Sequence, residues 1–202
     1  MADKEDRRIY LLRHGETEWS RLGKHTSVTD LPLTENGRAA ARRLRSVLAN
    51  ETLALVLTSP LRRARDTCEL AGLANAATID PDLMEWNYGD YEGLTTKEIQ
   101  SMRPGWSLFR DGCPGGESPA QVSARAERVI TRLQETEGHV ALFAHGHIFR
   151  VLAARWIDRP VSHAERFLLD TATLSVLGYY YQIRAVKVWN APVMGAHAET
   201  DL

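Results

Sequence analysis

Two short motifs, each at the end of an apolar run, contain residue types that suit chemistry at phosphorus. The run at residues 9–12 leads into Arg13-His14-Gly15, and the run at residues 140–144 leads into His145-Gly146. A guanidinium presents a planar fork of donors that matches phosphate oxygens. A neutral imidazole is a nucleophile, and a glycine lets a phosphate approach the backbone. These motifs therefore predict attack of a histidine on a phosphoryl group.

The apolar runs are predicted to be buried strands that place these motifs. We expect strands over residues 9–13, 53–58 and 139–144. Ser59-Pro60 follows the second strand and is predicted to cap and begin a helix that carries Arg63. In open α/β sheets, ligands bind beyond the carboxyl ends of the strands, where helix N-termini also favour anions. Three separate segments should therefore deliver cations and imidazoles to one edge of a sheet.

Helix and strand patterns alternate along the rest of the chain. Helices are predicted over 34–48, 95–102, 119–135 and 148–157, and β-rich stretches over 173–182 and 184–189. This alternation predicts an α/β fold, a three-layer α/β/α sandwich with a central, mostly parallel sheet. The whole chain, residues 1–202, is expected to form a single domain, with residues 192–202 as a loose C-terminal tail.

The composition narrows the class of partner. The chain has 202 residues and a formal net charge of −1, so no overall field attracts it to nucleic acid or to an anionic membrane. Two cysteines are too few for a disulfide framework or a four-cysteine zinc site. No apolar run approaches the length of a membrane span, and the charged N-terminus does not resemble a signal peptide. A cytoplasmic protein with no nucleic-acid or membrane partner is expected.

Four ordered motifs together resemble the histidine phosphatase superfamily, in the branch that contains cofactor-dependent phosphoglycerate mutases and small phosphatases. They are Arg13 to Thr17 with Trp19, Ser59 to Ala64, Glu85 to Gly89 with Glu92-Gly93, and Ala144 to His147. Within that branch, residues 13–37 and 112–118 resemble actinobacterial acid phosphatases, with fungal sedoheptulose-bisphosphatase-like enzymes further off. The resemblance covers most of the chain and implies a phosphoglycerate mutase-like fold.

The resemblance also implies roles for individual residues. His14 would be the nucleophile that forms a phosphohistidine, and Glu85 would protonate the leaving group and then deprotonate water, which suggests an acidic optimum. The transferring phosphoryl group would be held by Arg13, Arg63 and His145, whereas Arg62 would face solvent. Substrate or phosphate would be bound by Ser20, Thr26, Ser27, Tyr88 and Gly146. Neither a metal nor a cofactor is expected.

Two alternatives involve single residues. His145 and His147 have the spacing of a metal-binding pair, but the arginines expected at the same edge would repel a cation. His147 is therefore interpreted as a peripheral residue that lines the pocket. Cys113 would suit a thiolate phosphatase only with an arginine six residues later, and residue 119 is proline.

Three alternatives concern the reaction. A phosphoglycerate mutase is disfavoured because Thr96 stands where mutases have a lysine and because the segment between Glu92 and Gly115 is short. A protein phosphatase and a non-catalytic phosphate-binding module remain open. The leading prediction is a phosphomonoesterase, similar to an acid phosphatase, that acts on a small phosphorylated metabolite.

The features that would set the substrate are less specific. The loop 104–117, with its glycines and prolines, is predicted to be a specificity lid. Five aromatic residues either line the mouth of the site or belong to the core: Trp19, Trp86, Tyr88, Trp106 and Phe109. A homodimer is an expected assembly because dimers are common in the family.

Overall fold

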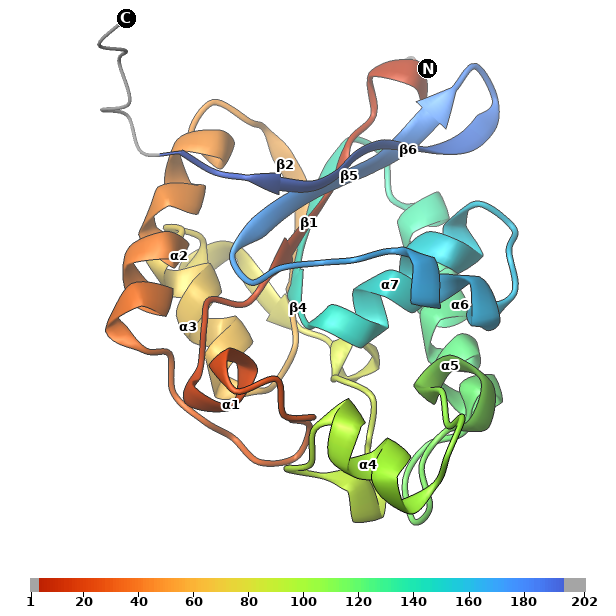
Figure 1. Cartoon of the computed structure of the whole chain (residues 1–202). Helices are drawn as coiled ribbons and strands as arrows, with labels where there is room; N and C mark the ends of the chain where they lie inside the picture. The colour runs from red at the N-terminus through yellow and green to blue at the C-terminus, as the bar shows by residue number, and fades with distance from the viewer. Residues whose placement is uncertain (1–3, 195–202) are drawn as a thin grey trace, which may run out of the picture.

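A six-stranded sheet forms the centre of the computed structural model, which describes residues 4–194 (Figure 1). The strands are β1 (Ile9–Arg13), β2 (Leu53–Thr58), β3 (Ala77–Ile79), β4 (His139–Ala144), β5 (Thr173–Tyr180) and β6 (Ile183–Pro192). Their order is β3-β2-β4-β1-β5-β6, in which the pairs among the first four strands are parallel and those made by β5 are antiparallel. The prediction of a mostly parallel sheet is confirmed.

Helices cover both faces of the sheet and complete three layers (Figure 1). On one face lie α2 (Glu35–Leu48) and α3 (Arg62–Leu70), and on the other lie α6 (Pro119–Glu135) and α7 (Gly146–Trp156). Toward the end where the parallel strands finish lie the shorter helices α1 (Glu18–Arg21), α4 (Thr96–Met102) and α5 (Leu108–Asp111). The 3₁₀ segments are η1 (Lys4–Asp6), η2 (Ala74–Ala76), η3 (Pro81–Leu83), η4 (Gly89–Tyr91) and η5 (Val161–Arg166). Within residues 4–194, no helix combines the length and apolar character that crossing a bilayer requires.

The central strand β1 contributes to two hydrophobic cores because successive side chains of a strand point to opposite faces. Ile9 and Leu11 belong to the larger core, which includes residues of α6 and α7. Tyr10 and Leu12 belong to the smaller core, which includes residues of α2 and α3. A strand covered on both faces must be apolar throughout, and that is why the sequence signal at residues 9–12 is a continuous run.

The register of the parallel strands brings their carboxyl ends to one level. Arg13 pairs with Ala144 across β1 and β4, and Thr58 pairs with Phe143 across β2 and β4. The ladder continues by one step, because the N–H of His14 donates to Ala144 O at 2.9 Å and that of Ser59 donates to Phe143 O at 2.9 Å. The residues that follow β1, β2 and β4 therefore start from the same edge, as predicted.

Some element boundaries differ from the sequence-based expectation. Ser59-Pro60 neither caps nor begins α3, because the helix starts at Arg62 and its N-cap is Leu61. The Ser59 hydroxyl instead accepts the Leu61 N–H at 3.3 Å and contacts His145, so this serine supports the site. Helix α7 starts at Gly146, two residues earlier than expected. The predicted loose tail begins where β6 ends, and its residues 195–202 lie outside the described part of the chain.

Gly15 and Gly37 allow the loop after β1 to pass close to the first turn of α2. A Cβ atom at Gly15 would lie 2.4 Å from Gly37 O, and one at Gly37 would lie 2.2 Å from Glu16 O. The expectation that Gly15 is small for the sake of a phosphate is therefore replaced by a packing reason. The close backbone contact fixes the loop that contains His14.

We expect Gly37→Ala to destabilise the protein. Overpacking costs about 1–3 kcal/mol, whereas the better helix propensity of alanine returns about 1 kcal/mol at most. Because the clash is with backbone atoms, we expect a net loss of about 1–2 kcal/mol in the free energy of unfolding, measured by chemical denaturation. Ala39→Ser, on the exposed side of the same helix, should change it by less than about 0.5 kcal/mol. An unchanged stability in Gly37→Ala would contradict the close approach.

Candidate active site

The His14 imidazole is buried at the carboxyl end of β1 and is held as a neutral ring. Its Nδ1 lies 2.7 Å from the carbonyl oxygen of Gly15. Because a carbonyl only accepts, Nδ1 carries the hydrogen and Nε2 keeps its lone pair. Burial, followed by the charges of Arg63 and Arg13, holds the pKa of His14 well below its usual value. The ring is therefore a nucleophile over a wide range of pH.

The His145 imidazole lies beside that of His14. The ring centroids are 5.1 Å apart and the ring planes are inclined by 55°. His145 is fully buried, and its Nε2 lies 2.8 Å from Ser59 Oγ. Burial, followed by the charge of Arg63, holds the pKa of His145 well below its usual value. The sequence prediction that these two histidines meet is confirmed in the structure.

Two arginines approach the histidines from different elements. Arg13 donates from one terminal nitrogen to the Leu169 carbonyl, and its guanidinium packs so closely on Gly146 that a Cβ there would lie 3.3 Å from Cζ. Arg63, on α3, is fully buried. Its neighbour Arg62 is exposed and forms an ion pair with Asp66 at 3.3 Å, so the expectation that Arg62 faces solvent is confirmed.

The terminal nitrogens of Arg63 fix the loop between α1 and α2. They donate to the carbonyls of Thr26 at 3.0 Å and of Ser27 and Thr29 at 3.3 Å. On the other side of this loop, the Glu92 carboxylate accepts the N–H of Ser27 at 2.8 Å and that of Thr29 at 3.1 Å. Ser27 is thus bound through its backbone on both sides.

Three buried nitrogens have no hydrogen-bond partner among residues 4–194: Arg13 Nε, Arg63 Nε and His145 Nδ1. A buried polar group without a partner costs about 1–3 kcal/mol. All three belong to residues that interact electrostatically with His14. The combination of cationic groups and unmatched nitrogens favours an anion with several acceptor oxygens.

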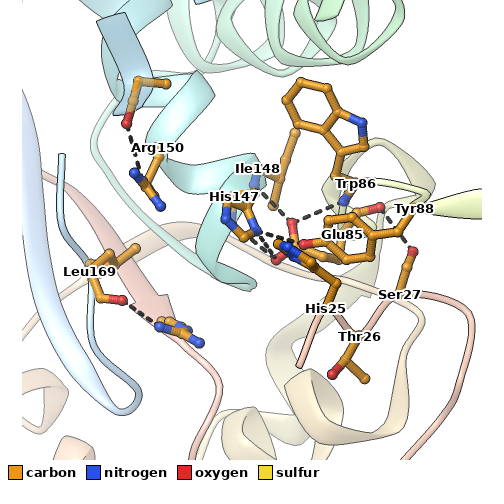
Figure 2. Close-up of polar contacts among 12 residues, drawn as sticks. His25, Thr26, Ser27, Glu85, Trp86, Tyr88, His147, Ile148, Arg150 and Leu169 are labelled. Carbon is orange, nitrogen blue, oxygen red and sulfur yellow. Dashed lines mark hydrogen bonds and ion pairs between the residues drawn. The ribbon is translucent and has the colours of Figure 1, made fainter. Parts of the chain in front are cut away.

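The Glu85 carboxylate is bound by backbone N–H groups, most of them at the N-terminus of α7 (Figure 2). Oε1 accepts from Trp86 and Ile148, both at 2.9 Å, and Oε2 accepts from His147 at 3.0 Å. Burial alone would raise the pKa of Glu85, but its interactions with the ring and the backbone N–H of His147 hold it well below its usual value. The environment therefore favours the carboxylate. An acidic optimum that depends on a readily protonated Glu85 has no support in this geometry.

The loop that carries Glu85 is held by Arg125 of α6. Arg125 donates to the carbonyls of Asp82 at 2.8 Å, Met84 at 2.9 Å and Glu85 at 3.4 Å. It also pairs with Glu117 through two bonds of 2.8 Å. One side chain thus fixes the segment that leads into Glu85.

A cavity of about 190 Å³ opens in front of these groups. Six predicted site residues line it: Arg13, His14, Ser20, Thr26, Glu85 and Tyr88. The predicted residues Arg63, His145 and Ser27 are fully buried, and Gly146 lies beneath the Arg13 guanidinium. The Ser20 hydroxyl takes part in the cap of α1, since it accepts the Thr17 N–H at 2.9 Å and donates to the Thr17 carbonyl at 3.0 Å.

Some lining residues were missed from the sequence: Gly23, Lys24, His25 and Thr96. Thr96 did carry a signal, because it stands where mutases have a lysine. Lys24 and His25 occupy an irregular segment without periodicity, so no pattern singled them out. His147 lines the cavity, as expected, but it is not peripheral, because its Nδ1 lies 2.6 Å from the Tyr88 hydroxyl and 3.7 Å from Glu85 Oε2.

The structure describes the surroundings of Cys113 and of the two histidines that have metal-pair spacing. Burial raises the pKa of the Cys113 thiol to about 12, which opposes a thiolate nucleophile. His145 is bonded to Ser59 and His147 to Tyr88. In the described part of the chain, no group of three or more His, Cys, Asp and Glu side chains is arranged to hold a metal ion.

The loop 104–117 is packed into the larger core, and this packing does not support the prediction of a lid. Trp106, Leu108 and Phe109 are almost completely buried there. No residue of this loop is among those that line the cavity within residues 4–194. Trp86 is also a core residue, so of the aromatic residues proposed for the mouth only Tyr88 contributes to the cavity.

Comparison with known proteins places this site in a family. The model of the histidine phosphatase superfamily (branch 1) matches residues 9–192. This chain belongs to the histidine phosphatase superfamily. An acid phosphatase of Mycobacterium tuberculosis is 40% identical over 185 residues, which cover 90% of this chain and 91% of the relative. Sedoheptulose 1,7-bisphosphatase of Saccharomyces cerevisiae is 38% identical and is matched over 76% of this chain and 69% of the relative.

Solved structures agree with this assignment. The product of an open reading frame of Mycobacterium tuberculosis matches with a TM-score of 0.89 and 38% identity, over 94% of this chain and 100% of that chain. A mycobacterial glucosyl-3-phosphoglycerate phosphatase in complex with VO3 matches with a TM-score of 0.81 and 31% identity, over 92% and 99%. Since the relatives are named as phosphatases, this histidine phosphatase is a phosphoric monoester hydrolase.

The neutral state of the two buried histidines is testable by NMR. Because burial and the arginines oppose protonation, the ring signals of His14 and His145 should remain those of neutral imidazole at pH values below the ordinary value of 6.5. The signals are assigned by comparison with His14→Asn and His145→Asn. A titration midpoint at or above 6.5 for either ring would contradict the described electrostatics.

The clamp on the Glu85 loop is testable by a matched pair of substitutions. Arg125→Met removes the side chain that donates to the Asp82 and Met84 carbonyls and that pairs with the Glu117 carboxylate, so we expect a loss of about 1–3 kcal/mol in the free energy of unfolding and lower activity. Arg128 lies on the same helix but is mostly exposed, and it pairs only with Asp82. Arg128→Met should therefore cost less than about 1 kcal/mol. Equal losses in the two variants would show that Arg125 has no special role.

Proposed function

We propose that this histidine phosphatase hydrolyses phosphate esters of small metabolites through a phosphohistidine at His14. The observation that carries the proposal is the set of groups around one imidazole. His14 presents an Nε2 lone pair, and the three residues that interact with its ring, Arg13, Arg63 and His145, each have one buried nitrogen without a partner. This is the environment that a transferring phosphoryl group requires, because its equatorial oxygens carry the charge of the transition state.

In the first half-reaction, Nε2 of His14 attacks phosphorus and the ester P–O bond breaks. Arg13, Arg63 and His145 hold the phosphoryl oxygens during the transfer. The hydrogen bond from His14 Nδ1 to Gly15 O supports attack by Nε2, because it keeps the hydrogen on Nδ1 and orients the ring. Covalent catalysis then replaces one difficult step by two easier steps.

In the second half-reaction, water attacks the phosphohistidine and Glu85 accepts its proton. The low pKa of Glu85 supports this role, because the residue is present as the carboxylate that a general base needs. Glu85 also lines the cavity, where a water molecule can approach. The same residue would protonate the leaving alkoxide in the first half-reaction, and for that step it needs a proton from its surroundings.

The cavity supports a small, polar substrate. Its volume is about 190 Å³, and its lining includes the polar residues Ser20, Thr26 and Thr96 and the basic residue Lys24. The named relatives act on phosphorylated small molecules: sedoheptulose 1,7-bisphosphate in yeast and glucosyl-3-phosphoglycerate in Mycobacterium tuberculosis. We extend to this chain the class of substrate, a phosphorylated small metabolite, and not either compound.

The proposal predicts a trapped phosphoenzyme. Wild-type protein mixed with a ³²P-labelled phosphate ester and quenched in alkali, in which phosphohistidine is stable, should carry label. His14→Ala should carry none, and its turnover of an aryl phosphate should fall by about 10⁴-fold or more because the nucleophile is lost. His163→Ala, an exposed histidine on η5, is the matched control and should behave as wild type. Label in His14→Ala at the wild-type level would refute the proposal.

A further inference from the structure

Glu85 is proposed to act as an acid, but its surroundings favour the ionised carboxylate. As an acid it must deliver a proton to the leaving oxygen, yet its carboxylate accepts three backbone N–H groups, from Trp86, His147 and Ile148. Such bonding stabilises the ionised form. A proton for the leaving group must therefore be stored on a neighbouring group. This inference rests on the proposed function.

The His147 side chain is next to Glu85 and faces the same cavity (Figure 2). Its Nδ1 lies 3.7 Å from Glu85 Oε2 and 2.6 Å from the hydroxyl of Tyr88. The ring is confined by aromatic neighbours, with centroid distances of 5.6 Å to His25 and 5.5 Å to Phe109. His147 is thus fixed with one nitrogen between the carboxylate and the phenol.

The other ionisable groups that face His147 do not offer an exchangeable proton; they are Tyr88, His25, Arg13 and Arg150. Burial raises the pKa of Tyr88 well above its usual value, so the phenol keeps its proton. Burial lowers the pKa of His25 to about 3, so that ring stays neutral. Arginine side chains do not release a proton in proteins. Burial, with the charges of Arg150 and Arg13, holds the pKa of His147 below its usual value, whereas Glu85 favours the charged form of the ring.

We propose that His147 is a positioning residue that shares one proton with Glu85 and is oriented for this by Tyr88. In the first half-reaction the proton moves from Nδ1 of His147 to Oε2 of Glu85 and on to the leaving alkoxide, while the P–O bond breaks and the bond from His14 Nε2 to phosphorus forms. In the second, the oxygen of a water molecule bonds to phosphorus while the bond from His14 Nε2 to phosphorus breaks, and the proton of that water moves to Glu85 and from there to His147. Each turnover consumes one water and leaves the pair as it began.

A shared proton has a distinctive pH dependence. The two groups titrate as a pair, so the proton is present at a higher pH than Glu85 could hold it alone. Formation of the phosphoenzyme from an ester with a poor leaving group should rise as the pH falls and the pair takes up its proton. Without His147, this rise should move to lower pH.

The test compares two leaving groups in His147→Asn, which keeps the backbone N–H to Glu85 and a polar atom near Nδ1 but cannot carry the proton. In single-turnover experiments, phosphoenzyme formation from a simple alkyl phosphate should slow by about 100-fold and that from 4-nitrophenyl phosphate by less than about threefold, because only the alkoxide needs an acid. The rise in rate with acid should also move to lower pH for the alkyl ester. Equal slowing of both esters, or no slowing, would overturn the inference.

Tyr88→Phe provides a second variant in case His147→Asn does not fold. It removes the hydroxyl that orients His147 and should show the same selective loss with the alkyl ester, to a smaller extent. The failure of this inference is distinguishable from failure of the proposed function. Absence of any phosphoenzyme in wild type overturns both, whereas a normal phosphoenzyme without leaving-group selectivity in the variants overturns only the role of His147.

Discussion

Burial of a neutral imidazole among guanidinium groups is the constraint on which the rest of this structure depends. Arg63 is fully buried, and its terminal nitrogens are satisfied by carbonyls of the loop at residues 26–29. Those bonds compensate for the loss of water around the charge. The same charge keeps His14 and His145 unprotonated. A change in the loop that breaks one of these hydrogen bonds would therefore disturb both the conformation of residues 26–29 and the protonation state of His14 and His145.

The carboxylate of Glu85 is the counterpart of this cationic side. It lies at the N-terminus of α7, where free backbone N–H groups stabilise an anion. His145, a neutral imidazole beside His14, immediately precedes that helix. The end of β4 thus supplies groups to both sides of the site within a few residues. The register between β1 and β4 therefore sets the position of these groups relative to His14.

Patterns in the sequence predict the parts of this protein that depend on local periodicity. The strands at residues 9–13 and 53–58 and the helix at 119–135 have the predicted bounds because apolar spacing and capping residues determine them. The meeting of His14 with His145 follows from the general rule that parallel strands end at one edge of a sheet. Contacts between distant irregular segments have no such periodicity. The position of His25 in the cavity and the packing of the loop 104–117 depend on tertiary contacts, for example that of His25 with Trp106 at 5.7 Å, and so could not be predicted.

The central claim is that the Nε2 atom of His14 bonds to phosphorus while Arg13, Arg63 and His145 hold the surrounding oxygens. A crystal structure with orthovanadate, which adopts the geometry of phosphoryl transfer, tests this claim most directly. If His14 is the nucleophile, vanadium should be bonded to its Nε2 atom, with equatorial oxygens in hydrogen-bond contact with the two arginines and with His145. Vanadate bound away from His14, or bound beside it without contact to Nε2, would contradict this mechanism.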